Sequence, residues 1–206
     1  PDVQIGDDVG RLLLDALDRA GLTPQDGDIL AVAQKIVSKA EGRLVDLADV
    51  TPGEQAVELA EQVGKDPRLV ELILRESEEV SRIRPGVIIV RHRLGFTSAN
   101  AGIDRSNVGP EGQERVLLLP LNPDASARVI RETIAAERGV DVGIVITDSH
   151  GRPFRLGTVG VAIGVAGLPA LWDRRGERDS YGYRLQHTDV GVADEIAAAA
   201  GLLMGQ

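Results

Sequence analysis

The chain has 206 residues, of which 43% are apolar, and its 23 basic and 32 acidic side chains give a formal net charge of −9. The acidic balance excludes nucleic acid as the main partner, because phosphate backbones need a broad basic face. The absence of cysteine excludes thiolate metal sites and indicates a reducing cytoplasm, and no apolar run reaches the roughly 18 residues of a membrane span.

The first half of the chain predicts helices and one buried strand. Residues 8–20 have the periodicity of an amphipathic helix, and residues 29–33 form an apolar run typical of a buried strand. Residues 51–54 (TPGE) have the pattern of a capping box, which predicts a helix to about Val63. Asp66 before Pro67 predicts the start of another helix.

The second half predicts strands that alternate irregularly with helices. Residues 86–90 and 143–147 are expected to be buried strands, the latter the most apolar. Residues 115–139 predict strand, turn and helix, with Asp124 as the N-cap and Gly139 as the C-terminal stop.

A last helix is predicted over residues 192–203. The mixture without strict alternation predicts an α/β (α+β mixed) fold with a mixed sheet rather than a doubly wound one. We expect a single catalytic domain over residues 1–206 with room for two lobes. The chain opens at Pro1 without a methionine and stops at Gln206, so we expect sequence to be missing at both ends.

A lysine pair marks the first candidate site. The chain has twenty arginines but three lysines, and two of these, Lys35 and Lys39, lie four residues apart in QKIVSK, which begins at Gln34. Two residues that lie four positions apart have their side chains on the same side of either a helix or a strand. A solvated face is one interpretation; contact with an anion is the other, and the apolar neighbours favour it.

Residues 98–109 (SANAGIDRSNVG) are the second candidate. Small residues surround one acid, Asp104, and one amide, Asn107. On local grounds this is a turn, because Asp, Ser and Asn commonly cap turns.

Residues 143–155 (GIVITDSHGRPFR) are the third candidate. Asp148 and Ser149 are expected to end a buried strand, where open α/β sheets bind ligands, and hard oxygen donors suit Mg²⁺ or Mn²⁺. Arg152 and Arg155 offer forked donors at a spacing that suits phosphate. An acid closing a strand, with two solvated arginines, is the alternative.

Residues 157–167 (GTVGVAIGVAG) lack the lysine of a phosphate loop, so we expect the glycines to allow close packing rather than to cradle phosphate. His92, His150 and His187 share no metal-ligand spacing, and ordinary polar roles are expected for them.

Taken together, the ordered motifs resemble those of the GTP-dependent coenzyme F-420:L-glutamate ligases, the gamma-glutamyl ligases of deazaflavin biosynthesis. The resemblance covers nearly the whole chain, through GDDVGRLLLDAL, GDILAVAQKIVSKAEGR, LGFTSANAGIDRSNVG, LLLPLNPDASA, VITDSHGRPFRLG, AIGVAGLPAL and VADEIAAAAGLLMGQ.

The resemblance implies roles for individual residues. Divalent metal, one ion or two, would be held by Asp104, Asp148 and Ser149, which replaces the turn interpretation of Asp104. GTP would be contacted by Gln34, Lys39 and Asn107. Lys39 is expected at a phosphate and counts, with Asp104 and Asp148, as a catalytic residue.

The chain departs from the family pattern in three places. Of a loop near the family's start that touches GTP, only Pro1 and Asp2 remain here, and they are the expected contacts. Family members usually continue past MGQ. Ser149 replaces a commoner threonine. FRLGT (residues 154–158), which contains Arg155, replaces a commoner WRNGQ. Arg152 and Arg155 are still expected to contact GTP.

The implied reaction joins L-glutamate to a carboxylate of a coenzyme F-420 precursor through an acyl phosphate, with GTP as co-substrate. The resemblance also implies Mg²⁺ or Mn²⁺, with K⁺ as a further candidate ion, and an intertwined homodimer with its active site in a groove at the interface. Two alternatives stay open: a metal-dependent nucleotide phosphohydrolase and a non-catalytic nucleotide-binding domain.

Overall fold

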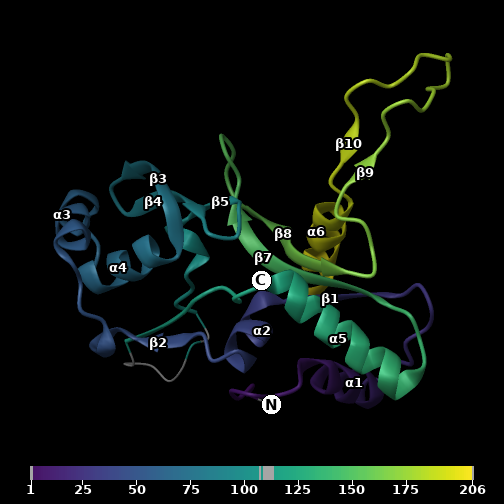
Figure 1. Ribbon diagram of the computed structural model, residues 1–206, viewed down its shortest axis with the longest axis horizontal. Coiled ribbons are helices and arrows are strands. Elements are labelled where there is room, and N and C mark those ends of the chain that lie inside the picture. The colour runs from purple at the N-terminus through teal and green to yellow at the C-terminus, as the bar shows by residue number, and fades with distance from the viewer. Residues whose placement is uncertain (1, 107, 109–113, 206) are drawn as a thin grey trace. The chain divides into compact units, whose positions relative to one another are not determined.

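A computed structural model describes residues 2–106, 108 and 114–205 (Figure 1). The helices are α1 (Val9–Arg19), α2 (Gln34–Ala40), α3 (Glu54–Val63), α4 (Pro67–Arg75), α5 (Pro123–Arg138) and α6 (Val192–Met204), with short 3-10 turns η1 (Leu47–Asp49) and η2 (Asn100–Gly102). The strands are β1 (Ile29–Ala33), β2 (Leu44–Asp46), β3 (Ser77–Arg84), β4 (Val87–His92), β5 (Thr97–Ala99), β6 (Arg115–Leu117), β7 (Gly143–Gly151), β8 (Thr158–Ala166), β9 (Trp172–Asp173) and β10 (Asp189–Val190).

The chain divides into two compact units. The first contains residues 1–6, 38–121 and 150–158, and the second contains residues 7–37, 122–149 and 159–206. Each has strands in more than one sheet, and parallel and antiparallel pairs both occur. The α/β class with mixed sheets, expected from the sequence, is confirmed.

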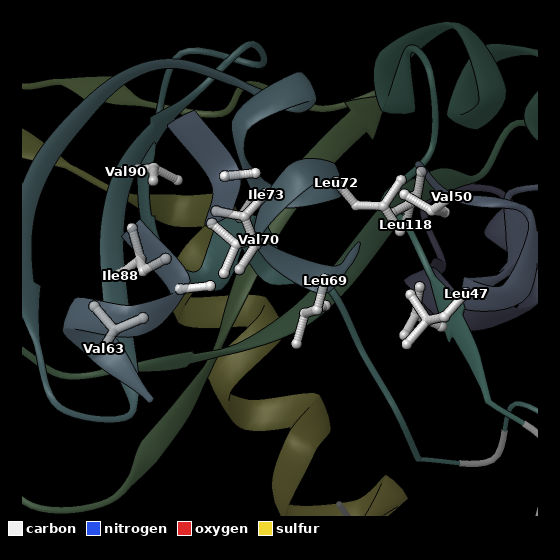
Figure 2. Close-up of a cluster of buried hydrophobic side chains, with 14 residues drawn as sticks. Leu47, Val50, Val63, Leu69, Val70, Leu72, Ile73, Ile88, Val90 and Leu118 are labelled. Atoms are coloured by element: carbon white, nitrogen blue, oxygen red, sulfur yellow. The ribbon is translucent and has the colours of Figure 1, made fainter. Parts of the chain in front are cut away.

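The first unit is built on an antiparallel sheet of order β3-β4-β5 and a smaller pair, β2-β6. Helices α3 and α4 pack against each other, and their apolar faces meet β4. Figure 2 shows the resulting cluster, in which Val70 and Ile73 of α4 lie near Ile88 and Val90 of β4. Leu118, just after β6, belongs to the same cluster, so the chain that follows β6 is anchored in this core.

The second unit is built on a sheet of order β1-β7-β8, in which β1 and β7 are parallel. Helix α1 packs on α5, and α6 contacts β1. Figure 1 shows β9 and β10 at the base of a long arm that continues through residues 174–188. None of the helices in the described part of the chain has the length and apolar character needed to cross a bilayer.

Helix ends were predicted correctly where a neighbouring residue supplies the cap. The carboxylate of Asp8 accepts a hydrogen bond from the Arg11 amide, and that of Asp66 accepts one from the Arg68 amide before Pro67 opens α4. Gly139 ends α5 in the left-handed conformation, with φ 68°. These stabilising contacts are local, and the sequence pattern was enough to predict the start at Asp66 and the end at Gly139; the cap by Asp8 was not predicted, because residue 8 was assigned to the helix itself.

Two predicted N-caps are wrong. Helix α3 begins at Glu54 after Gly53, without a capping bond from Thr51, because the Gly53 amide donates instead to the Glu71 carboxylate of α4, at 2.9 Å. Helix α5 is capped by Asn122 rather than Asp124; the Asp124 carboxylate accepts from the Val165 amide of β8, at 2.8 Å. In both cases a distant partner replaces the local bond.

Strand β7 is longer than predicted. The strand runs to Gly151, so Asp148 and Ser149 lie within it, and the prediction that they end the strand is wrong. Only the buried part of β7 ends before them, at Ile146. Pairing with β8 extends it, and the connection over residues 152–157 is too short for a parallel crossover, so β7 and β8 form a hairpin. The strand predicted at residues 86–90 is β4, displaced by one or two residues.

The glycines of β8 pack closely, as predicted. A Cβ on Gly160 would lie 2.6 Å from the Ala197 carbonyl oxygen of α6, and one on Gly164 would lie 2.5 Å from the Pro123 carbonyl carbon of α5. Both distances are below van der Waals contact, so these positions let the two helices approach the strand.

This packing predicts that Gly164→Ala destabilises the protein, by about 1–3 kcal/mol, because Pro123 is backbone-fixed and cannot move aside. Chemical denaturation would measure the loss. Gly151→Ala is the matched control, since a Cβ there meets nothing within 4 Å and no positive φ is involved. Equal stability of the two variants would contradict the close packing.

Candidate functional site

The register of β1 and β7 brings two predicted site residues together in the second unit. Ala33 is the partner of Thr147, and the next residues along the two parallel strands are Gln34 and Asp148. Gln34 opens α2 and is 2% exposed, whereas Asp148 is half-buried. Open sheets bind ligands beyond the carboxyl ends of parallel strands, and here an amide and a carboxylate lie where the parallel pairing of β1 with β7 ends, although β7 itself continues to Gly151.

The hairpin that follows Asp148 and Ser149 carries the two predicted arginines. Ser149 is exposed, as are Arg152 and Arg155 in the connection between β7 and β8. The Arg155 amide donates to the Arg152 carbonyl at 3.3 Å, and the Arg152 guanidinium donates to the Leu156 carbonyl. Phe154, inside this turn, has φ 59° and a fully exposed ring. A positive φ is unfavourable for a bulky residue, so the turn holds a strained backbone between two cations.

Asp104 is held by both its main chain and its side chain in the first unit. Its amide donates to the Leu117 carbonyl at 3.0 Å, and its carbonyl accepts from the Leu117 amide at 2.8 Å. Its carboxylate accepts from the amide of Ser106 at 2.7 Å and from the Ser106 hydroxyl at 2.9 Å. The local turn interpretation thus describes the bonds with Ser106. The main-chain bonds with Leu117 of β6 fix the position of the Asp104 backbone, from which the carboxylate projects.

Lys39 and Asp2 form an ion pair in the first unit, with 3.2 Å between Nζ and Oδ1. The Lys39 side chain is 22% exposed and that of Asp2 is 76% exposed. Lys35 and Lys39 both lie on α2, so the spacing of four residues is a helical one. Two residues predicted to contact GTP are therefore in contact with each other.

The predicted site residues are distributed over both units. Asp104, Lys39, Asp2, Arg152 and Arg155 belong to the first unit, and Gln34, Asp148 and Ser149 belong to the second. Pro1 and Asn107, also predicted to contact GTP, lie outside the described residues.

The donor set fits a hard divalent cation. Asp104, Asp148 and Ser149 offer carboxylate and hydroxyl oxygens, which are the ligands that Mg²⁺ and Mn²⁺ prefer. Among residues 2–106, 108 and 114–205, no three His, Asp or Glu side chains gather as a metal cage. A site of few protein oxygens completed by phosphates and water is the usual arrangement for Mg²⁺.

Sequence reasoning missed a buried charge cluster in the first unit. The Glu76 carboxylate forms ion pairs with Arg43, at 2.8 Å, and with Arg93, at 3.0 Å. His92 is fully buried; its Nδ1 accepts from the Leu94 amide, and its ring stacks on Phe96 with centroids 5.2 Å apart. Nothing in the local sequence signals this cluster, because its members come from three separate segments of the chain.

Comparison with known proteins completes the description of the site. The sequence profile of the family described as "F420-0:Gamma-glutamyl ligase" matches residues 1–206, the full length of the chain. The chain belongs to this family. The resemblance seen in the motifs is thereby confirmed.

Three relatives of this gamma-glutamyl ligase family carry the name "Coenzyme F420:L-glutamate ligase". The protein of Methanothermobacter thermautotrophicus is 50% identical over 206 residues, which are all of this chain and 81% of that protein. The protein of Methanopyrus kandleri is 49% identical over 204 residues, 99% of this chain and 78% of its own length. The protein of Halobacterium salinarum is 45% identical over 212 aligned residues, 100% of this chain and 79% of its own length.

The burial of His92 predicts a pH-dependent stability. Burial lowers the pKa of His92 from 6.5 to about 4, the charge of Arg93 adds to this, and Glu76 opposes it; Arg43 and His150 also face the ring. The folded-state pKa lies below the unfolded one, so the contribution of neutral His92 is complete above pH 6.5 and is lost as the pH falls towards 4.

Denaturation curves across this range should show a loss of up to about 3 kcal/mol in wild type that His92→Gln lacks. An identical pH profile in the two proteins would show that His92 does not titrate as its burial implies.

Proposed function

We propose that the chain is a GTP-dependent ligase that joins L-glutamate to a carboxylate of a coenzyme F-420 precursor. The observation that carries the proposal is 50% identity over the entire chain with a protein named coenzyme F420:L-glutamate ligase. Gln34 and Asp148 directly follow the last residues of the parallel pairing between β1 and β7, and this placement supports the proposal, because open sheets bind ligands beyond the carboxyl ends of parallel strands.

The proposed chemistry has two steps. The precursor carboxylate attacks the γ-phosphorus of GTP, forming an acyl phosphate and releasing GDP. The glutamate amine then attacks the acyl carbon, expels phosphate and loses a proton, which leaves an amide. Negative charge spreads over the phosphoryl oxygens in the first step, so positioning and positive charge account for most of the catalysis.

The chain's own residues have distinct roles in this scheme. Asp104 in the first unit, and Asp148 with Ser149 in the second, would hold Mg²⁺ or Mn²⁺, which when bound neutralises phosphate charge. Lys39 would exchange its ion pair with Asp2 for one with a phosphate oxygen. Gln34, Arg152 and Arg155 would orient the nucleotide through amide and guanidinium donors. K⁺ is a further candidate ion.

We also propose that the ligase is a homodimer. The β9–β10 arm, residues 172–190, exposes aromatic side chains: Trp172 is 52% exposed, Tyr183 58% and Tyr181 97%. Aromatic side chains are enriched at protein interfaces, so this arm is a candidate contact surface between two copies. Light scattering would measure the mass of the protein in solution, and we expect that of a dimer.

Product analysis separates the proposal from its main alternative, a nucleotide phosphohydrolase. A ligase consumes GTP only when precursor and glutamate are both present, and it forms one amide for each GDP. A phosphohydrolase releases phosphate from GTP alone. A third outcome, tight GTP binding without turnover in the presence of both co-substrates, would indicate a non-catalytic nucleotide-binding domain.

The metal assignment predicts the behaviour of two amide variants. Mn²⁺ with GTP should stabilise wild type by about 2.7 kcal/mol at a hundredfold excess over the dissociation constant, or on the order of 5–10 °C in Tm. Asp104→Asn and Asp148→Asn should lose most of this shift and all ligation, because an amide cannot replace an anionic oxygen on a hard cation. A full shift in either variant would remove that residue from the metal site.

The lysine assignment predicts unequal effects within α2. Lys39→Ala should raise the KM for GTP about 10- to 100-fold, the loss of a charged hydrogen bond worth roughly 1.5–3 kcal/mol. Lys35→Ala, a matched change one helical turn away, should have the smaller effect. Steady-state kinetics at saturating precursor and glutamate would measure both, and the reverse order would show that Lys39 is not the phosphate contact.

A further inference from the structure

The buried cluster around Glu76 holds a specific piece of backbone. Glu76 follows α4 as its C-cap and is 8% exposed, and the side chains of Arg43 and Arg93 that pair with it are 16% and 27% exposed. A carboxylate between two guanidinium groups at this depth neutralises charges that would otherwise repel. The donors that the two arginines do not turn towards Glu76 point to main-chain carbonyls.

Those carbonyls belong to consecutive residues after β6. Arg43 Nε donates to the Leu119 oxygen at 2.8 Å, and Arg93 donates to the Pro120 oxygen at 3.0 Å and to the Leu121 oxygen at 2.8 Å. On the same segment, the Leu121 amide donates to the Glu41 carboxylate at 2.8 Å. Beyond the end of β6, the main chain thus forms hydrogen bonds with side chains, where a β-strand would form them with a neighbouring strand. The planar guanidinium groups donate in fixed directions and so hold this segment in one orientation.

Asp104 is joined to the start of this segment. Leu117, the last residue of β6, makes both main-chain bonds to Asp104, and the Leu118 amide donates to the Arg43 carbonyl. A displacement of residues 118–121 therefore acts on Leu117 and on the backbone from which the Asp104 carboxylate projects. The path from Glu76 to Asp104 consists only of the two arginines, this short segment and one residue of β6.

We propose that Glu76 is a positioning residue for Asp104, acting through Arg43, Arg93 and residues 117–121. The inference rests on the proposed function, in which Asp104 supplies an oxygen ligand to the divalent metal. Without the Glu76 charge, Arg43 and Arg93 face each other without their shared anion, and their hold on three successive carbonyls weakens. The backbone that carries the Asp104 side chain is then held less firmly. Metal binding weakens as a result, although every ligand is present.

The test measures Mn²⁺ binding in the absence of nucleotide, from the electron paramagnetic resonance signal of the free ion. Glu76→Gln should raise the Mn²⁺ dissociation constant about tenfold while far-ultraviolet circular dichroism stays that of wild type. Glu71→Gln is the matched control: this α4 carboxylate also has two partners, the Gly53 amide and the Arg75 guanidinium, and both lie outside residues 117–121. Its Mn²⁺ affinity should equal that of wild type.

Arg93→Ala is a second test that does not depend on whether Glu76→Gln folds. It removes the bonds to Pro120 and Leu121 while leaving the Glu76–Arg43 pair, and it should also weaken Mn²⁺ binding. In ligation assays both variants should need more Mn²⁺ for half-maximal rate, with an unchanged KM for glutamate; a general loss of structure would alter both.

The outcomes distinguish this inference from the function on which it rests. Wild-type Mn²⁺ affinity in folded Glu76→Gln and Arg93→Ala, with affinity lost in Asp104→Asn, would overturn the positioning role alone. Unchanged affinity in Asp104→Asn would overturn the metal assignment itself. Weakened binding in Glu76→Gln, Arg93→Ala and Asp104→Asn, with Glu71→Gln unaffected, is the result expected.

Discussion

The parallel pairing of β1 with β7 is the constraint on which the second unit depends. It joins segments more than a hundred positions apart, so the chain must close a long loop before this pair stabilises anything. Because β1 leads directly into α2, the same pairing sets where that helix begins relative to Asp148. A register slip of one residue would turn Asp148 to the other face of the sheet, so the apolar residues 144–146, which set the register, also decide which face of the sheet carries the Asp148 carboxylate.

Carboxylates hold together much of what lies outside helices and ladders. Glu71 supplies the cap that α3 lacks, Asp124 binds β8 from the first turn of α5, and Glu76 neutralises the arginines behind β6. Acidic side chains that look like solvated surface in the sequence are therefore partners for amides and cations from distant segments. The excess of acid over base is in part structural.

How much could be predicted from sequence follows from the range of the interactions. The cap by Asp66 and the helix end at Gly139 depend on the nearest few residues, and these predictions were correct. The caps at Thr51 and Asp124 were wrong because tertiary partners compete with local bonds. Close packing at the glycines of β8 could be anticipated, since the phosphate-loop lysine is missing and little else explains so many glycines.

The candidate site shows the same division. An acid and a hydroxyl after an apolar run led to the assignment of Asp148 and Ser149, which stays a prediction, and the ordered motifs led to the family, which is confirmed. Glu76 could not be found in this way, because it lies in a run of charges and its partners, Arg43 and Arg93, are distant in the sequence. The role proposed for Glu76 depends on the folded backbone of residues 117–121, which the sequence pattern does not reveal.

The way α5 and α6 meet β8 has a consequence for self-association. In the order β1-β7-β8 this strand lies at one margin of its sheet, where open amides could recruit a strand from another molecule. The Ala162 amide donates to Asp194 and the Val165 amide to Asp124, each at 2.8 Å, so these donors are already occupied by side chains of helix first turns. A strand added to β8 from another molecule would compete with these two side-chain bonds, which disfavours growth of the sheet, the route to amyloid-like aggregates.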